Sequence, residues 1–105
     1  MGLLHSIFGI NSTAKKVTEL LQKGAIIIDV RTAEEFSKGK IPNSKNVPLQ
    51  EFERSLDEII KIGSPIILCC QSGMRSKKAF SILKKKRTDC MNAGSWQNIK
   101  GLVQK

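Results

Sequence analysis

Two short runs of apolar residues constrain the fold more than any other feature of this sequence. Residues 25–30 (AIIIDV) and 66–69 (IILC) are rich in β-branched side chains and almost free of polar ones. Such runs are typical of strands buried on both faces, as in a parallel sheet. Segments with apolar residues at helical spacing surround them, so strands alternate with helices. This alternation predicts an α/β domain with a mainly parallel sheet and right-handed crossovers.

Cap and turn residues place the other elements. A helix is predicted from Ser12 or Thr13 to about Lys23, after an N-terminal arm of residues 1–11. Three further helices are predicted over residues 33–38, 52–60 and 76–86. Asn46–Pro48 and Thr88–Met91 are short candidate strands, followed by a loop that contains Gly94 and Trp96.

Size and composition indicate a single globular domain over residues 1–105. No apolar run approaches the roughly 20 residues that span a bilayer, so no membrane partner is expected. Three cysteines, two of them adjacent, do not make a disulfide framework, which favours a reducing, cytoplasmic location. They also lack the paired C-x-x-C spacing of a zinc site, so no metal or cofactor is expected.

The net charge of +9 comes largely from one basic segment, residues 77–87. A nucleic-acid surface would need aromatic side chains for base stacking, but aromatics make up only 5% of the chain and Tyr is absent. No nucleic-acid partner is therefore expected. A solvated helix face with a basic C-terminal end is the simpler interpretation. A third is a positive field that attracts small anions toward the preceding cysteines.

A cysteine at the end of the second apolar run is the candidate nucleophile. The run ends at Cys69 and Cys70, a tight loop containing Gly73 follows, and Arg75 opens the predicted helix. Backbone N–H groups at a helix N-terminus stabilise a thiolate or a bound anion. The chain has only one histidine, His5, which argues against a cysteine–histidine protease or transferase.

Three stretches, taken together and in order, resemble a single-domain rhodanese, a sulfurtransferase family. They are residues 28–36 (IDVRTAEEF), 39–48 (GKIPNSKNVP) and 70–76 (CQSGMRS), with a weaker echo at 94–96 (GSW). They resemble the family's DVR…EEF, GHIPGAINIP, CxxGxRS and GGW segments. Lys40, Asn43 and Ser95 depart from the usual His, Gly and Gly, outside the cysteine loop.

The resemblance implies a rhodanese-like fold with a five-stranded parallel sheet and helices on both faces. It also implies a persulfide intermediate on Cys70, because Gly73 stands three residues after it, as the family's glycine does. Cys69 would then be a small buried hydrophobe. The implied substrate-binding loop is Gln71, Ser72, Gly73, Met74 and Arg75.

Several roles stay open at this point. Arg75 either binds the substrate anion or pairs with an acid such as Asp29 to hold the loop. Asp29 and Arg31 are expected to brace the strand end, and Trp96 to anchor the last loop. Cys90 is either a buried thiol or a resolving thiol.

The resemblance implies a small anionic sulfur donor such as thiosulfate and a thiophilic acceptor, which is cyanide or a thiol. A sulfur-acceptor protein is a further candidate partner, in which case the chain would be a persulfide carrier or a binding module. Phosphatases and arsenate reductases of the same fold are the other alternative. They use a loop one residue longer, whereas four residues separate Cys70 from Arg75 here.

Overall fold

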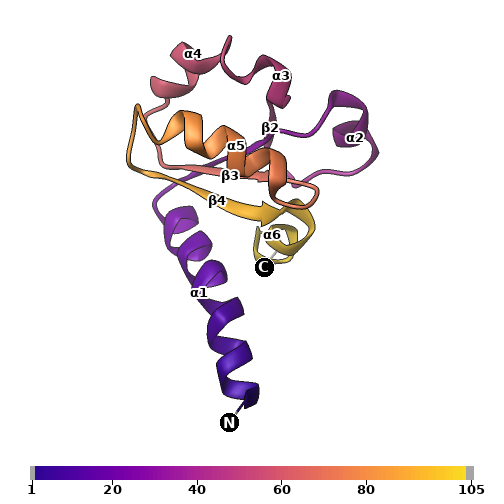
Figure 1. Cartoon of the computed structure of the whole chain (residues 1–105), viewed down its shortest axis with the longest axis vertical. Helices are drawn as coiled ribbons and strands as arrows, with labels where there is room; N and C mark the ends of the chain where they lie inside the picture. Colours follow the sequence, from indigo (N-terminus) through magenta and orange to yellow (C-terminus); the bar gives the residue numbers. More distant parts are fainter. Residues whose placement is uncertain (1, 104–105) are drawn as a thin grey trace.

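The computed structural model describes residues 2–103, with side-chain surroundings from Ser12 onward. In this part of the chain one sheet contains four parallel strands in the order β2-β1-β3-β4 (Figure 1). The strands are β1 (Ile26–Asp29), β2 (Lys45–Asn46), β3 (Ile66–Cys70) and β4 (Cys90–Ser95). The helices are α1 (Gly2–Gln22), α2 (Ala33–Lys38), α3 (Leu49–Phe52), α4 (Leu56–Ile60), α5 (Met74–Leu83) and α6 (Trp96–Val103).

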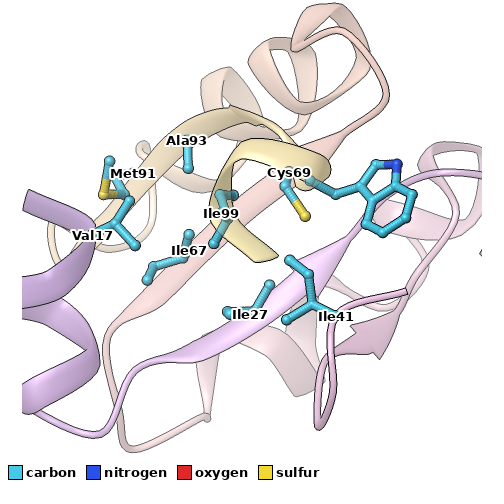
Figure 2. Close-up of a cluster of buried hydrophobic side chains, with 9 residues drawn as sticks. Val17, Ile27, Ile41, Ile67, Cys69, Met91, Ala93 and Ile99 are labelled. Carbon is cyan, nitrogen blue, oxygen red and sulfur yellow. The ribbon is translucent and has the colours of Figure 1, made fainter. Parts of the chain in front are cut away.

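Helices cover both faces of the sheet, as predicted (Figure 1). On one face α1 and α6 pack through Val17, Trp96 and Ile99 onto the strands, a cluster that Figure 2 shows around Ile67 and Cys69. On the other face α3, α4 and α5 contribute a second cluster with Ile28, Leu68 and Cys70, namely Phe52, Ile59, Ala79 and Leu83. Successive strand residues alternate between the two clusters because side chains in a strand point to opposite faces.

The register brings the carboxyl ends of the central strands together. Asp29 of β1 lies beside Cys69 of β3, and Cys70 lies beside Ser95 of β4. Between β3 and β4 the pairing shifts at Leu68 and Cys69, where β4 accommodates one extra residue. Such a bulge bends a strand and redirects its side chains.

The five-stranded sheet implied by the rhodanese resemblance is wrong for the described residues, which form four strands. From Gly2 to Gln22 the chain before β1 is helical, and after β4 it enters α6, which runs to Val103, so neither flank supplies another strand within residues 2–103. The predicted helix start at Ser12 or Thr13 is also wrong, because α1 begins at Gly2. The segment predicted as an arm carries apolar residues at helical spacing and, from Gly2 on, continues this helix away from the sheet (Figure 1).

Other predicted element boundaries also differ from the observed ones. The helix predicted over residues 52–60 is two short helices, α3 and α4, separated at Glu53–Ser55. The candidate strand at Asn46–Pro48 ends at Asn46, because Pro48 lacks the N–H that a ladder needs and instead precedes α3. The last strand runs over Cys90–Ser95, and Trp96, expected in a loop, begins α6.

None of the helices within residues 2–103 is long and apolar enough to cross a membrane.

Candidate active site

Cys69 and Cys70 end the same strand but belong to different environments. Both are fully buried, yet Cys69 lies in the cluster beneath α1 and α6, whereas Cys70 lies in the cluster beneath α5. β2 follows β1 in the chain and lies on one side of β1 in the sheet, whereas β3 lies on the other side of β1. The strand order therefore changes direction between β1 and β3. Ligands of open parallel sheets bind outside the carboxyl ends of strands at such a point. Cys70 is therefore at the position where ligands of such sheets bind.

The loop after β3 wraps hydrogen-bond donors around the sulfur of Cys70. The backbone N–H of Gly73 donates to Sγ at 3.0 Å, and that of Ser76 at 3.4 Å. The Ser76 hydroxyl lies 3.3 Å from the same sulfur. Gly73 makes this turn with a φ of 99°, a left-handed conformation that glycine adopts without steric cost, and directly precedes α5. The sulfur thus sits among N–H groups at a helix N-terminus.

These donors make the three free cysteines chemically different. Burial raises the pKa of Cys70, but the hydrogen bonds from the Ser76 hydroxyl and from the Ser76, Gly73 and Ser72 backbones outweigh it, so the pKa is lowered overall. Burial raises the pKa of Cys69 far above its usual range, and raises that of Cys90 as well. The difference supports the prediction that Cys70 is the nucleophile and Cys69 a buried hydrophobe, since the thiolate is the reactive form.

Arg75 makes a bidentate ion pair with Glu35, a residue that sequence reasoning had not assigned to it. Its Nη1 and Nη2 donate to the two carboxylate oxygens at 2.7 and 3.0 Å. Glu35 also accepts from the Thr32 backbone as part of the capping box that begins α2. The hydrogen bonds from Arg75, followed by that from Thr32, lower the pKa of Glu35 to about 2. Arg75 therefore ties the cysteine loop to α2, and its role in substrate binding stays a prediction.

Asp29 and Arg31 brace the neighbouring strand end, as predicted. The Arg31 Nε donates to both Asp29 carboxylate oxygens at 3.0 and 2.9 Å, and both residues are buried. Arg31 also donates to the Gly39 carbonyl at 2.7 Å, and its guanidinium stacks 4.2 Å from the centre of the Trp96 ring. The Trp96 Nε1–H in turn donates to the Gln71 Oε1 at 3.0 Å. Trp96 is thus the expected packing anchor, and it also fixes the residue that follows Cys70.

Two residues near the sulfur had no assigned role in the sequence analysis. The CxxGxRS motif includes Ser76 without indicating its role, although its place in the first turn of a helix whose cap is Gly73 brings it back toward Cys70. Asn92 of β4 accepts a hydrogen bond from the Ser76 hydroxyl at 2.6 Å. Nothing in the local sequence around Asn92 indicates this contact, because it depends on how β4 pairs with β3.

The outer side of the loop is open, while the sulfur lies beneath it. Gln71 and Ser72 are exposed, and Met74 is 74% exposed. Two hollows flank the loop, and Cys70 lines neither of them. The smaller, about 250 Å³, is bounded by Arg31, Glu35, Lys38, Gly39, Gln71 and Trp96. The larger, about 630 Å³, lies along α5 beside Arg75, Lys78 and Ile82, over Val30 and Leu49.

Between residues 2 and 103, no cluster of three or more His, Cys, Asp or Glu side chains could hold a metal ion.

The chain is an α/β protein in which an inner strand of a four-stranded parallel sheet ends at a cysteine, and the sulfur of this cysteine accepts hydrogen bonds from backbone N–H groups. Such a loop can bind an anion or stabilise a thiolate. The family comparison is more specific. The profile of the rhodanese-like domain matches residues 13–102, and the chain belongs to this family.

Solved structures of related proteins share the fold. The human single-domain sulfurtransferase TSTD1 superposes with a TM-score of 0.63 at 27% identity, over 83% of this chain and 89% of that one. The reduced Bacillus anthracis protein CoADR-RHD gives a TM-score of 0.69 at 30% identity, over 86% of this chain but 16% of that one.

Curated relatives are similar over shorter stretches. Thiosulfate sulfurtransferase 18 of Arabidopsis thaliana is 37% identical over an alignment of 77 residues that covers 61% of this chain and 57% of that protein. The putative sulfur carrier protein YrkF of Bacillus subtilis (strain 168) is 39% identical over 59 residues, 56% of this chain and 31% of that protein. The chain thus spans between 31% and 57% of the length of these two relatives.

Proposed function

We propose that this protein is a sulfurtransferase that carries a sulfane sulfur on Cys70. The observation that carries the proposal is the ring of donors on Sγ, with Gly73 N–H at 3.0 Å and the Ser76 backbone and hydroxyl at 3.4 and 3.3 Å. An unassisted thiol with a pKa near ~8.5 is only a few per cent thiolate at pH 7. The donors raise that fraction and need no histidine base.

The reaction has two displacement steps at sulfur. In the first, the Cys70 thiolate attacks the outer sulfur of thiosulfate or a similar sulfane donor. An S–S bond to Sγ forms, the donor's own S–S bond breaks, and sulfite leaves with the bonding pair. In the second, cyanide or a thiolate attacks the outer sulfur of the persulfide, and Cys70 leaves as a thiolate again. The same donors stabilise the negative charge on Cys70 before the first step and after the second.

The residues in and around the cysteine loop have different proposed roles. The backbone of Gly73 supplies a donor to the sulfur, and the side chains of Gln71, Ser72 and Met74 form the outer surface that a donor or acceptor meets. Arg75 holds the loop through its pair with Glu35. Asp29 and Arg31 keep the adjoining strand end in place.

The loop supports sulfur transfer over phosphoryl or arsenate chemistry. Only four residues lie between Cys70 and Arg75, and the guanidinium donates both Nη groups to Glu35. A phosphate would need those donors, because arginine recognises tetrahedral oxyanions through the same bidentate fork. A sulfane sulfur needs only the backbone donors.

A persulfide carrier for a partner protein is the second candidate. It is favoured by the exposure of Met74 at the rim of the loop, where a partner surface could contact it. One relative is named a putative sulfur carrier protein. Carrier and enzyme share the first displacement and differ only in the acceptor.

Intact-protein mass spectrometry after incubation with thiosulfate tests the shared step. Wild type, Cys69→Ala and Cys90→Ala should each gain the mass of one sulfur atom, and Cys70→Ala should gain none. A persulfide that persists in Cys70→Ala would overturn the assignment. On the same samples, turnover of thiosulfate with cyanide should exceed any turnover of aryl phosphate or arsenate. The reverse order would overturn the proposed reaction and leave the fold standing.

A further inference from the structure

The Ser76 hydroxyl lies among three groups that compete for its single proton. Its oxygen is 2.6 Å from the Asn92 Oδ1, 3.3 Å from the Cys70 Sγ and 3.3 Å from the Gly73 carbonyl oxygen. A hydroxyl has one proton to donate and lone pairs to accept with. It can therefore lower the pKa of Cys70 only when that proton points at the sulfur. Which acceptor holds the proton decides what Ser76 does for the nucleophile.

Two further contacts fix the orientation of the Asn92 carboxamide. Its Oδ1 accepts from the Gly94 backbone N–H at 3.0 Å, and its Nδ2 lies 3.4 Å from the Gly73 carbonyl oxygen. Exchanging oxygen and nitrogen would set an amide N–H₂ against the N–H of Gly94 and an oxygen against the carbonyl of Gly73. The atom 2.6 Å from Ser76 is thus an oxygen that only accepts, so the Ser76 proton lies on that bond.

The sheet explains why Asn92 reaches this place. The pairing of β3 with β4 shifts between Leu68 and Cys69, which lie opposite Asn92 and Gly94. The extra residue in β4 separates Asn92 from Gly94, and the Gly94 N–H donates back to the Asn92 side chain. Asn92 therefore links β4 to both ends of the cysteine turn, the Gly73 carbonyl and the Ser76 hydroxyl.

We propose that Asn92 is a positioning residue that holds the Ser76 proton away from Cys70, so that the hydroxyl turns to the sulfur only after the thiolate forms. While Cys70 is a thiol, the proton stays on Asn92 and the Ser76 oxygen accepts from the Cys70 S–H. When the thiol loses its proton, the charged sulfur is the strongest of the three acceptors, and the hydroxyl rotates to donate to it, which lowers the pKa of Cys70 by less than a hydroxyl free of Asn92 would. Asn92 thereby limits how much thiolate the free protein carries. Its use in sulfur transfer rests on the proposed function, but its effect on the thiol does not.

The charged groups around Cys70 do not take part in this exchange. On α5, Arg75 is paired with Glu35 of α2, and at the end of β1, Asp29 is paired with Arg31. The β4 residues beside the sulfur, Asn92 and Ser95, are neutral, and α3 and α4 contribute the apolar side chains of Phe52 and Ile59 to the surrounding cluster. A substitution at Asn92 leaves both ion pairs in place, so a change in the thiol pKa reports on the Ser76 proton.

A double-mutant cycle tests the proposal. Cys69→Ala and Cys90→Ala provide the background, so that Cys70 is the only thiol, and its pKa is read from the pH dependence of the iodoacetamide alkylation rate. Asn92→Ala frees the Ser76 proton and should lower the pKa by about 0.5–1 unit, the equivalent of one neutral hydrogen bond. Ser76→Ala removes the donor and should raise the pKa. In the Ser76→Ala protein, Asn92→Ala should no longer shift the pKa.

Asn92→Asp keeps the protein testable if Asn92→Ala does not fold, because it is isosteric and keeps an oxygen for the Gly94 N–H. Its other oxygen replaces the Nδ2 that contacts the Gly73 carbonyl, and measuring the variant with and without the Ser76 hydroxyl cancels that change. Asn92→Asp should raise the pKa more when the Ser76 hydroxyl is present than when it is absent. Equal shifts from an Asn92 substitution with and without the Ser76 hydroxyl, or a higher pKa in Asn92→Ala, would overturn the proposal. The alkylation readout needs no sulfur donor, so a failure of the proposed reaction would appear separately, as absent persulfide.

Discussion

Gly73→Ala is the sharpest test of the cysteine loop, because the structure separates the two costs of adding a methyl group there. The first cost is conformational. Gly73 has a φ of 99°, and an L-residue in the left-handed region costs roughly 1–2 kcal/mol. The second is steric. A Cβ at Gly73 would lie 3.3 Å from the Gly94 Cα and 3.9 Å from its carbonyl carbon, which are backbone atoms that move only with β4.

Gly24→Ala is the matched control. Gly24 has a φ of 83°, and a Cβ there would meet nothing within 4 Å, so it carries the conformational cost alone. We expect Gly24→Ala to destabilise the protein by about 1–2 kcal/mol and Gly73→Ala by about 1 kcal/mol more, the size of a modest overpacking penalty. In a domain of this size, 1 kcal/mol lowers Tm by roughly 4–8 °C.

Thermal and urea unfolding of the two variants measure this difference in the free energy of unfolding. Alkylation of Cys70 adds a functional readout, because a displaced Gly73 N–H no longer donates to Sγ at 3.0 Å. Gly73→Ala should slow alkylation near neutral pH, and Gly24→Ala should not. Equal stability losses in the two variants would show that Gly73 and Gly94 do not approach closely, and unchanged alkylation would refute the role of the Gly73 donor.

Two further predictions concern charge. Glu35→Gln keeps the capping oxygen but removes the ion pair. The folded-state pKa of Glu35 is lowered from 4.5 to about 2, so the pair stabilises the protein fully above pH 4.5 and loses this effect as the pH falls toward 2. Wild type should therefore be more stable than the variant at pH 7, by at most about 1 kcal/mol because the pair is one-third exposed, and Tm curves that stay parallel down to pH 2 would contradict this. If the lysines of α5 attract thiosulfate, kcat/KM should fall with rising salt in wild type, and Lys77→Gln/Lys78→Gln should flatten that dependence while Lys15→Gln/Lys16→Gln on α1 does not. An unchanged salt dependence of kcat/KM in the α5 variant would mean that these lysines form only a solvated helix face.

Short-range features of the sequence were enough to predict the inner strands of the sheet. The apolar runs before Asp29 and Cys70 are too short and too β-branched for helices and too apolar for exposed strands. They therefore predict buried parallel strands. The capping residues of α2 and the glycine before α5 act over a few residues, and those boundaries came close to the observed ones. Cys70 was singled out for the same reason, since a thiol, a glycine turn and a helix N-terminus follow one another along the chain.

Contacts between distant segments could not be read in this way. Arg75 pairs with Glu35 across 40 positions, where the sequence analysis had offered Asp29 as an example, and Asp29 is instead paired with Arg31. Asn92 meets Ser76 only because β4 pairs with β3 through a bulge, and a register shift of one residue would direct its side chain to the other face. Trp96 reaches Gln71 and Arg31 only because α6 begins directly at the end of β4.

Local sequence was therefore sufficient to predict the α/β class, the inner strands and the candidate nucleophile, since each depends on neighbours within a turn or two of chain. The number of strands, the partner of Arg75 and the acceptor of the Ser76 proton were set only in the folded arrangement. Those depend on strand register and on which charges and polar groups are buried together, and neither is set until the sheet has assembled.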